Sequence, residues 1–268
     1  MTLPQNTERL RCKGVAIIGL LIVNSIGCDS HPELETAQRF QEAESAFSLA
    51  GSEDEFSRVA GQYNELLAEG FISGVVLYNQ GNAWMRAGKT GRAIASWRQA
   101  QRYRPRDPYL RANLQSAITA CDSQASVIPK TGIAGYVLFW QNWLSYPEKF
   151  LLSTILLVAT LTAAILGTLV SQRHVGRRLA LVFGFLFVVI ALSAAWDWQR
   201  YDQTIYGVVI QGSVEARKGN SESYENAFTE PLMEGAEFMV LEERAGWLNI
   251  HITNLGTAWI SARAAVTY

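Results

Sequence analysis

Four polar side chains between residues 75 and 113 have the types and spacing needed to bind a peptide. Tyr78, Asn82 and Arg86 follow one another at four-residue steps, which a helix places on one face. Asparagine offers a donor and an acceptor to a peptide backbone, arginine can hold a carboxylate in bidentate fashion, and tyrosine adds rigid contact area. Asn113 falls at the matching position of a later helix. We therefore predict partner-binding roles for Tyr78, Asn82, Arg86 and Asn113, with an ordinary solvated helix surface as the alternative.

Cys28 is a candidate for covalent modification. The apolar run Val15 to Gly27 follows a basic segment, in the order of a secretory signal peptide, and is shorter than the about 20 residues that a membrane-spanning helix needs. Ser25 to Cys28 resembles a bacterial lipobox, with Ser25 in place of the usual leucine, and Asp29 resembles an inner-membrane retention signal. Residues 1–28 are predicted to be a signal peptide with Cys28 as its lipidation site. A plain signal peptide and an uncleaved anchor are the alternatives.

No constellation of residues predicts catalysis or a metal site. The three histidines lie in three different regions, and the sequence lacks a GxSxG, an HExxH and a glycine-rich phosphate loop. The three cysteines have no CxxC or Cys/His spacing. A net charge of −1 gives no basic footprint for a nucleic-acid backbone. We therefore expect a protein that is not an enzyme, with no cofactor, no metal and no nucleic-acid partner.

The helices that would carry the binding residues follow a repeat spacing. Small, aromatic and proline residues are separated by the steps 3, 9, 4, 3 and 5 that are typical of tetratricopeptide repeats; these residues are Gly81, Trp84, Ala93, Trp97, Ala100 and Pro105. The small residues would let two antiparallel helices approach, the tryptophans would fill the space between them, and the proline would end the second helix.

A weaker repeat precedes this one. One 34-residue period earlier, Val59, Tyr63 and Leu66 take the positions of the second-helix residues. Leu110 to Ala120 reads as a single capping helix, which such stacks need because each repeat leaves one apolar face open. Residues 29–125 are therefore predicted to be a tetratricopeptide module of about two repeats and a cap, with an ordinary α-helical domain as the alternative.

Two later apolar blocks predict a transmembrane hairpin. Residues 150–170 and 179–198 are each about long enough to span a bilayer. The intervening segment 171–178 carries three arginines. The positive-inside bias therefore predicts that this segment is a cytoplasmic loop. Aromatic residues outside both blocks mark the opposite interface, and residues 126–149 form a linker and interfacial segment. The alternative is a buried helical hairpin in a soluble protein.

The last segment, 204–268, changes to the alternating pattern of short strands. Glycine and tryptophan positions in it resemble the bacterial SH3-like pattern, with Ala258 in place of the usual glycine before the last tryptophan. We predict a small all-β SH3-like barrel in which Trp247 and Trp259 belong to the core rather than to a ligand platform. A wall-peptide-binding barrel is the alternative.

The order of these segments resembles the BatE-type proteins encoded with aerotolerance (Bat) operons. The segments that carry this resemblance are Leu66 to Phe71, Tyr78 to Ala83 and Pro105 to Leu114, with Gln80 in place of the family's leucine. The resemblance implies partnership with membrane-bound von Willebrand factor A proteins and a MoxR-type AAA ATPase, in envelope stress or in the maturation of other proteins.

The sequence thus predicts a multidomain scaffold: an all-α tetratricopeptide repeat module, a two-helix transmembrane hairpin and an all-β SH3-like barrel. Both soluble modules are expected on the periplasmic side of the bacterial cytoplasmic (inner) membrane. The alternative functions are a peptidoglycan-associated targeting protein that uses the barrel, and a cytochrome c maturation subunit, for which no heme-handling histidine or CxxC is present. The direct partner and the stoichiometry stay open.

Overall fold

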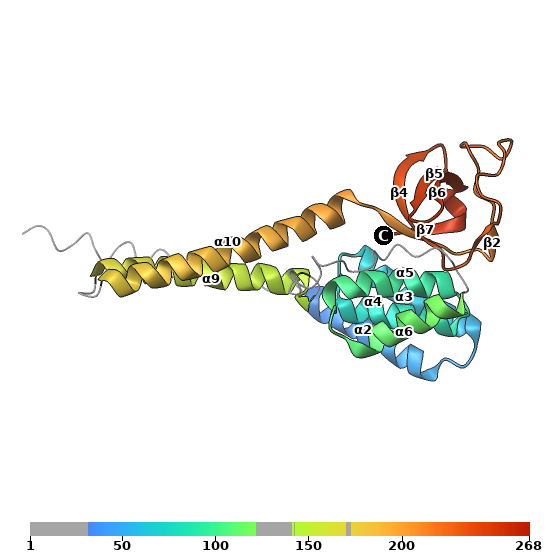
Figure 1. The fold of residues 1–268 in the computed structure, drawn as a ribbon. Helices are drawn as coiled ribbons and strands as arrows, with labels where there is room; N and C mark the ends of the chain where they lie inside the picture. Colours follow the sequence, from blue (N-terminus) through green and yellow to red (C-terminus); the bar gives the residue numbers. More distant parts are fainter. Residues whose placement is uncertain (1–31, 122–140, 142, 170–172) are drawn as a thin grey trace, which may run out of the picture. The chain divides into compact units, whose positions relative to one another are not determined.

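The computed structural model describes residues 32–121, 141, 143–169 and 173–268. The predicted signal peptide, its Cys28 and most of the linker expected at 126–149 lie outside the described residues. The chain divides into two compact units, Met1–Arg39 and Phe40–Tyr268. The second unit holds most of a helical module, a long helical hairpin and a β-domain, in that order along the chain (Figure 1).

Three helices of the helical module begin at a side-chain cap. Ser52 and Glu55 form a reciprocal capping box at the start of the second helix, Ser73 caps the third, and Asp107 caps the last one directly before Pro108. The five helices are α2 (Pro32–Leu49), α3 (Glu53–Ala68), α4 (Gly74–Arg86), α5 (Thr90–Tyr103) and α6 (Pro108–Ala120).

Helices α4 and α5 pack closely because Gly81 has no side chain. A Cβ atom at this position would overlap the ring of Trp97, which is 2% exposed and donates its Nε1 hydrogen to the carbonyl of Tyr78 over 3.3 Å. Gln80 lies in the same buried contact and accepts a hydrogen bond from Ser96 Oγ at 2.9 Å. The buried carboxamide of this glutamine is satisfied because Ser96 is its hydrogen-bond partner.

We expect Gly81→Ala to lower the free energy of unfolding by about 1 to 3 kcal/mol, because the new methyl group must displace Trp97 from a well-packed contact. Gly61→Ala is the matched control: Gly61 lies in α3, and no atom lies within 4 Å of the place that a methyl group would take there. Alanine at this position should stabilise the helix by about 0.5 to 1 kcal/mol. Chemical denaturation followed by circular dichroism measures both changes, and equal effects at the two glycines would contradict the packing argument.

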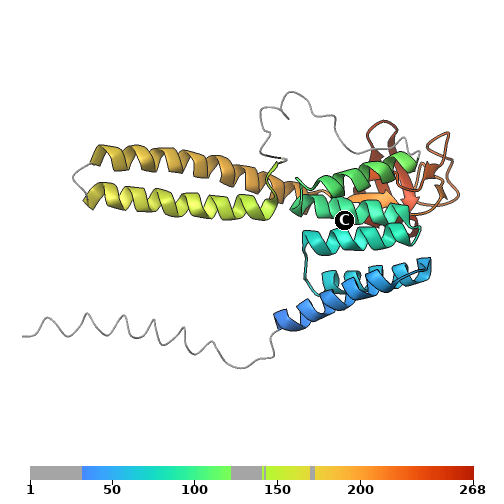
Figure 2. The same ribbon diagram turned by 90° about the horizontal axis from the view of Figure 1, so that it is seen from below.

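Helices α9 (Tyr146–Leu169) and α10 (Arg173–Gln203) lie side by side as a hairpin (Figures 1 and 2). Both contain a stretch that is long and apolar enough to cross a membrane. Only 17% and 11% of these stretches are buried within the protein, whereas the core helix of a soluble protein is mostly buried. The two helices are therefore candidate membrane spans by length, composition and exposure.

The boundaries of the hairpin differ from the sequence expectation. The sequence predicts a loop at 171–178, but α10 begins at Arg173, so its three arginines lie on the first turns of a helix. This segment has no proline and contains good helix formers, so the helix need not stop where the apolar block stops. At 31 residues, α10 is about 46 Å long and exceeds the about 30 Å thickness of a hydrocarbon core.

The β-domain contains a five-stranded antiparallel sheet with the order β6-β5-β4-β1-β7 and a two-stranded ribbon of β2 and β3. Alternate residues of the long strands point into one core, which includes Phe238, Ile250 and Ile260. A two-residue turn, Ala245 and Gly246, joins β4 to β5, and both residues have positive φ. The strands are β1 (Tyr206–Val209), β2 (Ser213–Val214), β3 (Leu232–Met233), β4 (Glu237–Arg244), β5 (Trp247–Ile252), β6 (Gly256–Ser261) and β7 (Ala265–Thr267).

Trp247 and Trp259 do not lie in this core, which corrects the expectation from the sequence. On β5 and β6 the tryptophans alternate with the buried positions and lie on the opposite face; the buried positions are Leu248, Ile250, Ile252, Ala258 and Ile260. Both tryptophans are half-buried. A pattern of alternating apolar residues does not say which face is the core when large aromatic residues occupy the other one.

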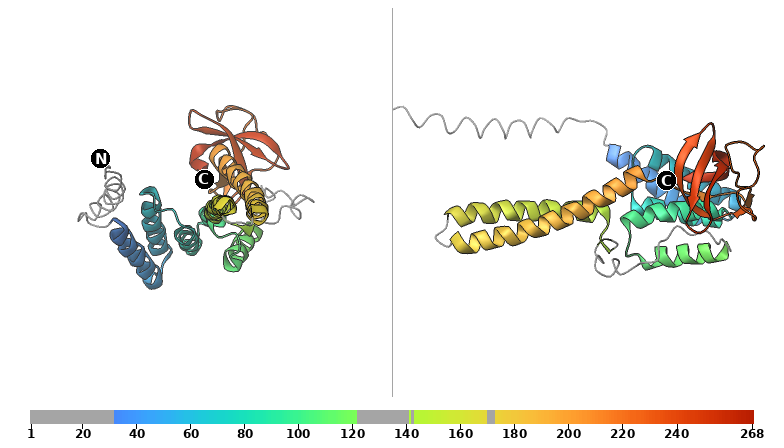
Figure 3. Two further views of the ribbon diagram at one scale, coloured as in Figure 1. Left: turned by 90° about the vertical axis from the view of Figure 1, so that its left-hand side faces the viewer. Right: turned by 45° about the horizontal axis from the view of Figure 1, so that its top comes forward.

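Strands β1 and β7 of the β-domain contact helix α5, and Figure 3 shows the strands of the β-domain, coloured orange to red, gathered in one body. Val208 of β1 belongs to the same buried cluster as α5 and α6, and Tyr268 packs against that cluster. Arg98 of α5 makes a bidentate ion pair with Glu237 of β4, at 2.5 Å from Nε to Oε1 and 2.9 Å from Nη2 to Oε2. The helical module and the β-domain therefore share apolar core and a buried ion pair, although the hairpin separates them in the sequence.

Candidate functional site

Three of the four predicted binding residues meet where α4 and α6 lie side by side. Asn113 of α6 donates from Nδ2 to the hydroxyl of Tyr78 at 3.2 Å and to Oδ1 of Asn82 at 3.3 Å. All three side chains are half-buried. The helical spacing of Tyr78 and Asn82 and the capped start of α6 bring the three polar groups together, so they form one hydrogen-bonded cluster, here called the inner cluster.

A contact of the same kind occurs 34 residues earlier in the chain, between α4 and α2. Asn79 of α4 donates from Nδ2 to the carboxylate of Glu44 in α2 at 3.2 Å. Asn113 and Asn79 are 34 residues apart, and so are their partners Tyr78 and Glu44. Helices α2, α4 and α6 are therefore related by a regular register, and the inner cluster lies on the layer that these helices form.

The inner cluster keeps hydrogen-bonding capacity for a ligand. Among the described residues, Nδ2 of Asn82 and Oδ1 of Asn113 have no hydrogen-bond partner. A donor and an acceptor thus lie next to each other on adjacent helices. This is the complement of one residue of an extended peptide, whose N–H and C=O point to the same side of the chain.

Arg86 is not part of the inner cluster. It is exposed on the last turn of α4, and its guanidinium carbon lies 5.6 Å from the ring centroid of Phe56 in α3. The cation is attracted to the face of that ring. The four-residue spacing alone could not predict this, because Phe56 comes from another helix.

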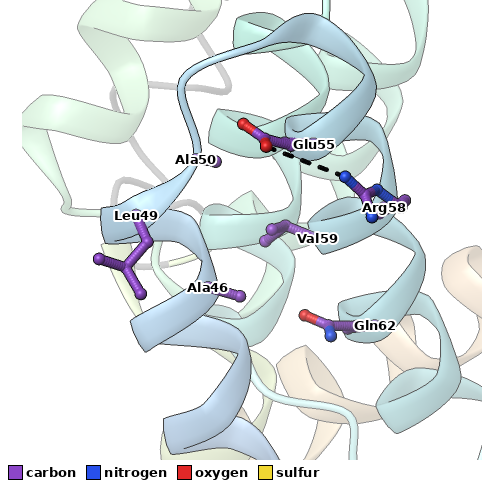
Figure 4. A pocket seen from close by; sticks show the side chains of 7 residues that line it. All are labelled: Ala46, Leu49, Ala50, Glu55, Arg58, Val59 and Gln62. Atoms are coloured by element: carbon purple, nitrogen blue, oxygen red, sulfur yellow. Dashed lines mark ion pairs between the residues drawn. The ribbon is translucent and has the colours of Figure 1, made fainter.

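A surface groove lies between the end of α2 and the start of α3, as Figure 4 shows. Its volume is about 260 Å³, and its lining is apolar except for Glu55, Arg58 and Gln62. Glu55 accepts hydrogen bonds from the backbone N–H groups of Gly51 and Ser52, which lower the pKa of its carboxyl. This carboxylate serves the capping box at the start of α3.

A buried polar cluster in the hairpin was not found from the sequence. Lys149 of α9 is 0% exposed and donates to Oδ2 of Asp197 in α10 at 2.5 Å and to the carbonyl of Gln141 at 2.8 Å. Gln141 in turn donates to Asp197 and accepts from Ser193. Charged residues at the ends of apolar blocks are the available sequence signal, because such groups are costly there unless they are paired.

At the opposite end of the hairpin, small residues replace polar ones. A Cβ atom on Gly176 of α10 would overlap the backbone of Gly167 in α9 and lie 3.1 Å from the carbonyl oxygen of Ala163. Small residues allow helices to approach closely where water does not drive their association. The hairpin is thus fixed by an ion pair at one end and by backbone contact at the other.

No group of three or more metal-binding side chains occurs within the part of the chain that the structure describes. Cys121, at the end of α6, is half-buried against Gly235, and burial raises the pKa of its thiol. No protein-family model, curated protein or solved structure matches the chain. The inner cluster is therefore the candidate functional site on its geometry alone.

Proposed function

We propose that this chain is a membrane-anchored scaffold for protein–protein interaction, built from a tetratricopeptide repeat module, a transmembrane hairpin and an SH3-like barrel. The resemblance to BatE-type proteins suggests a Bat/MoxR-type envelope complex. In that complex, membrane-bound von Willebrand factor A proteins and a MoxR-type AAA ATPase would be the partners. The scaffold holds its partner by recognition of an extended segment and carries out no chemistry of its own.

The unpaired amide donor and acceptor of the inner cluster are the observation that carries this proposal. They lie on adjacent helices of a regularly spaced layer, and Tyr78 beside them supplies an aromatic surface. An extended partner backbone that ran across α4 and α6 would complete both hydrogen bonds with the N–H and C=O of one residue. The 34-residue register of Asn79 and Asn113 also supports the repeat assignment.

Asn82→Ala combined with Asn113→Ala is expected to weaken partner recovery by about 5- to 150-fold, because two hydrogen bonds worth about 1 to 3 kcal/mol in total are lost. Crosslinking pull-down from native membranes with quantitative mass spectrometry measures the change. Asn64→Ala with Gln115→Ala is the matched control, since both carboxamides are exposed and lie outside the inner cluster, on α3 and α6.

Tyr78→Phe separates binding from stability in this experiment. It removes the hydrogen bond from Asn113 and leaves the asparagine pair in place. Thermal denaturation shows whether the double variant is as stable as Tyr78→Phe. If it is, and it still recovers as much partner as the unaltered chain, the inner cluster is not the binding site.

The proposed orientation places both soluble modules in the periplasm. Alkaline phosphatase fused after Cys121 or after Tyr268 should be active, and the same enzyme inserted at Gly176 should be inactive, because the arginines at the start of α10 favour the cytoplasm. Cell fractionation of each fusion confirms that it is membrane-bound. Activity at Gly176 alone would reverse the orientation.

The outward position of Trp247 and Trp259 favours a second candidate, a peptidoglycan-associated targeting protein. Trp259 is paired with Asn249 across the sheet, so an aromatic ring and a carboxamide share the face opposite the core. Such a face can contact a wall peptide. Co-sedimentation with isolated sacculi, in place of recovery with a membrane protein, would favour this candidate.

A further inference from the structure

Two turns of the helical module come together at one of its ends. A Cβ atom on Gly74, at the start of α4, would lie 2.7 Å from Cγ of Arg104 and 2.8 Å from Cβ of Tyr103, at the end of α5. The turn that precedes α4, residues 69–73, is therefore next to the turn that follows α5, residues 104–107. We call these two turns, together with Tyr109 on the first turn of α6, the turn surface.

The turn surface lies beside the end of the hairpin at which α9 begins. Arg106 forms an ion pair with Glu148 of α9, and its guanidinium carbon lies 4.7 Å from the ring centroid of Trp143. Glu148 comes two residues before Phe150, which is 63% exposed and starts the apolar surface of α9. From Phe150 to Leu169 the helix is about 30 Å long, which matches the hydrocarbon thickness of a bilayer.

Arg106 is therefore at the level of the lipid headgroups if the hairpin spans a membrane. This position follows from the contacts of Arg106 and holds for either orientation of the hairpin.

Exposed apolar side chains gather on the turn surface. Phe71 is 41% exposed, Ile72 is 56% exposed and Tyr109 is 75% exposed. With Val75 they are four of the six large apolar side chains that are exposed in residues 40–121, all of which the structure describes; the other two are Leu49 and Met85. A concentration of this kind marks a contact surface rather than the scattered apolar residues of an ordinary exterior.

Most of the charges around these side chains are paired. Arg104 pairs with Asp107 and Arg106 pairs with Glu148, while Arg111 donates to the carbonyl of Pro105. Two of the three arginines are thus neutralised within the protein, so we do not expect the interaction to depend on anionic lipid. Apolar contact, with tyrosine and tryptophan at the polar boundary, is the chemistry that remains.

We propose that the turn surface rests on the membrane, with Phe71, Ile72 and Tyr109 inserted among the lipid headgroups. This inference depends on the proposed membrane anchoring of the hairpin. It implies that the helical module is held at the bilayer by three attachments: the hairpin, the Arg106–Glu148 pair and the inserted side chains. The inner cluster would then face a partner at a fixed height above the lipid.

Site-specific photocrosslinking of the full chain in lipid nanodiscs tests the proposal. A benzophenone amino acid replaces Phe71 or Tyr109 in nanodiscs of phosphatidylcholine alone or mixed with phosphatidylglycerol. Met85 is the matched control, because it is 39% exposed near the other end of α4, about 16 Å along the helix from its start. We expect several-fold more lipid adduct at positions 71 and 109 than at 85, with equal yields in both lipid mixtures.

Two further measurements explain a result in which positions 71 and 109 give no excess of lipid adduct. The same probe at Leu157, on the exposed surface of α9, should react with acyl chains. Lipid adducts at position 157 with no excess at 71 and 109 over 85 would overturn the turn-surface proposal alone, whereas no adduct at 157 would overturn the membrane span and this inference with it. Ile72→Asp should lower the adduct yield at position 109, and an unchanged yield would also overturn the proposal.

Discussion

Replacing Glu237 with alanine is expected to lower the free energy of unfolding by about 3 to 5 kcal/mol, because it leaves the arginine of a buried ion pair without its partner. The side chains of Arg98 and Glu237 are 12% and 2% exposed, and two charge-assisted hydrogen bonds join them. The loss should affect the helical module and the β-domain together, because the pair lies between α5 and β4.

Chemical denaturation of the detergent-solubilised chain measures this change. Glu225→Ala is the matched control, since Glu225 also pairs with a cation, Lys218, but both side chains are more than half exposed. That variant should change stability little because solvent screens the pair. The double variant Arg98→Leu with Glu237→Leu should recover most of the loss, as no unpaired charge remains. A loss at Glu237 no larger than at Glu225 would contradict the argument.

Asp197→Leu is expected to separate the two helices of the hairpin, at a cost of about 3 to 5 kcal/mol. Lys149 is 0% exposed and would keep only the carbonyl of Gln141 as a partner. In a bilayer a lone ammonium group near the hydrocarbon boundary is costly, so Lys149 should turn outward and α9 should move away from α10. Equilibrium unfolding in sodium dodecyl sulfate, followed by circular dichroism, measures the loss.

The control for this second prediction lies at the same level of the hairpin. Arg106→Gln also removes one member of an ion pair, but Arg106 and Glu148 are each 41% exposed, so the expected loss is at most about 1 kcal/mol. Lys149→Leu combined with Asp197→Leu should be more stable than Asp197→Leu alone. If both single variants unfold like the unaltered chain, the buried cluster does not hold the hairpin.

Local features of the fold could be predicted from the sequence. The cap at Asp107, the close approach at Gly81 and the apolar hairpin each depend on residues that are near one another in the chain or on a regular spacing. The starts of α9 and α10 could not be predicted as well, because nothing in an apolar block says how far its helix continues into polar sequence.

Long-range contacts were beyond sequence reasoning. Arg98 and Glu237 are 139 residues apart, and neither lies in a pattern that names the other as its partner. Of the candidate site, the repeat spacing correctly placed Tyr78, Asn82 and Asn113 near one another. It could not predict that Asn113 would bond to both of the others, or that Arg86 would turn to Phe56 of another helix.

The core shared by α5 and the β-domain has a consequence for biogenesis. The helical module is synthesised first, but the face of α5 that carries Arg98 is completed only when β1 and β4 arrive after the hairpin. If just one of the two hairpin helices entered the bilayer, the two halves of that core would be left on opposite sides of it. Such a chain would display an apolar helix face and an unpaired arginine. If the hairpin spans a membrane as proposed, its correct insertion is thus a condition for the maturation of both modules.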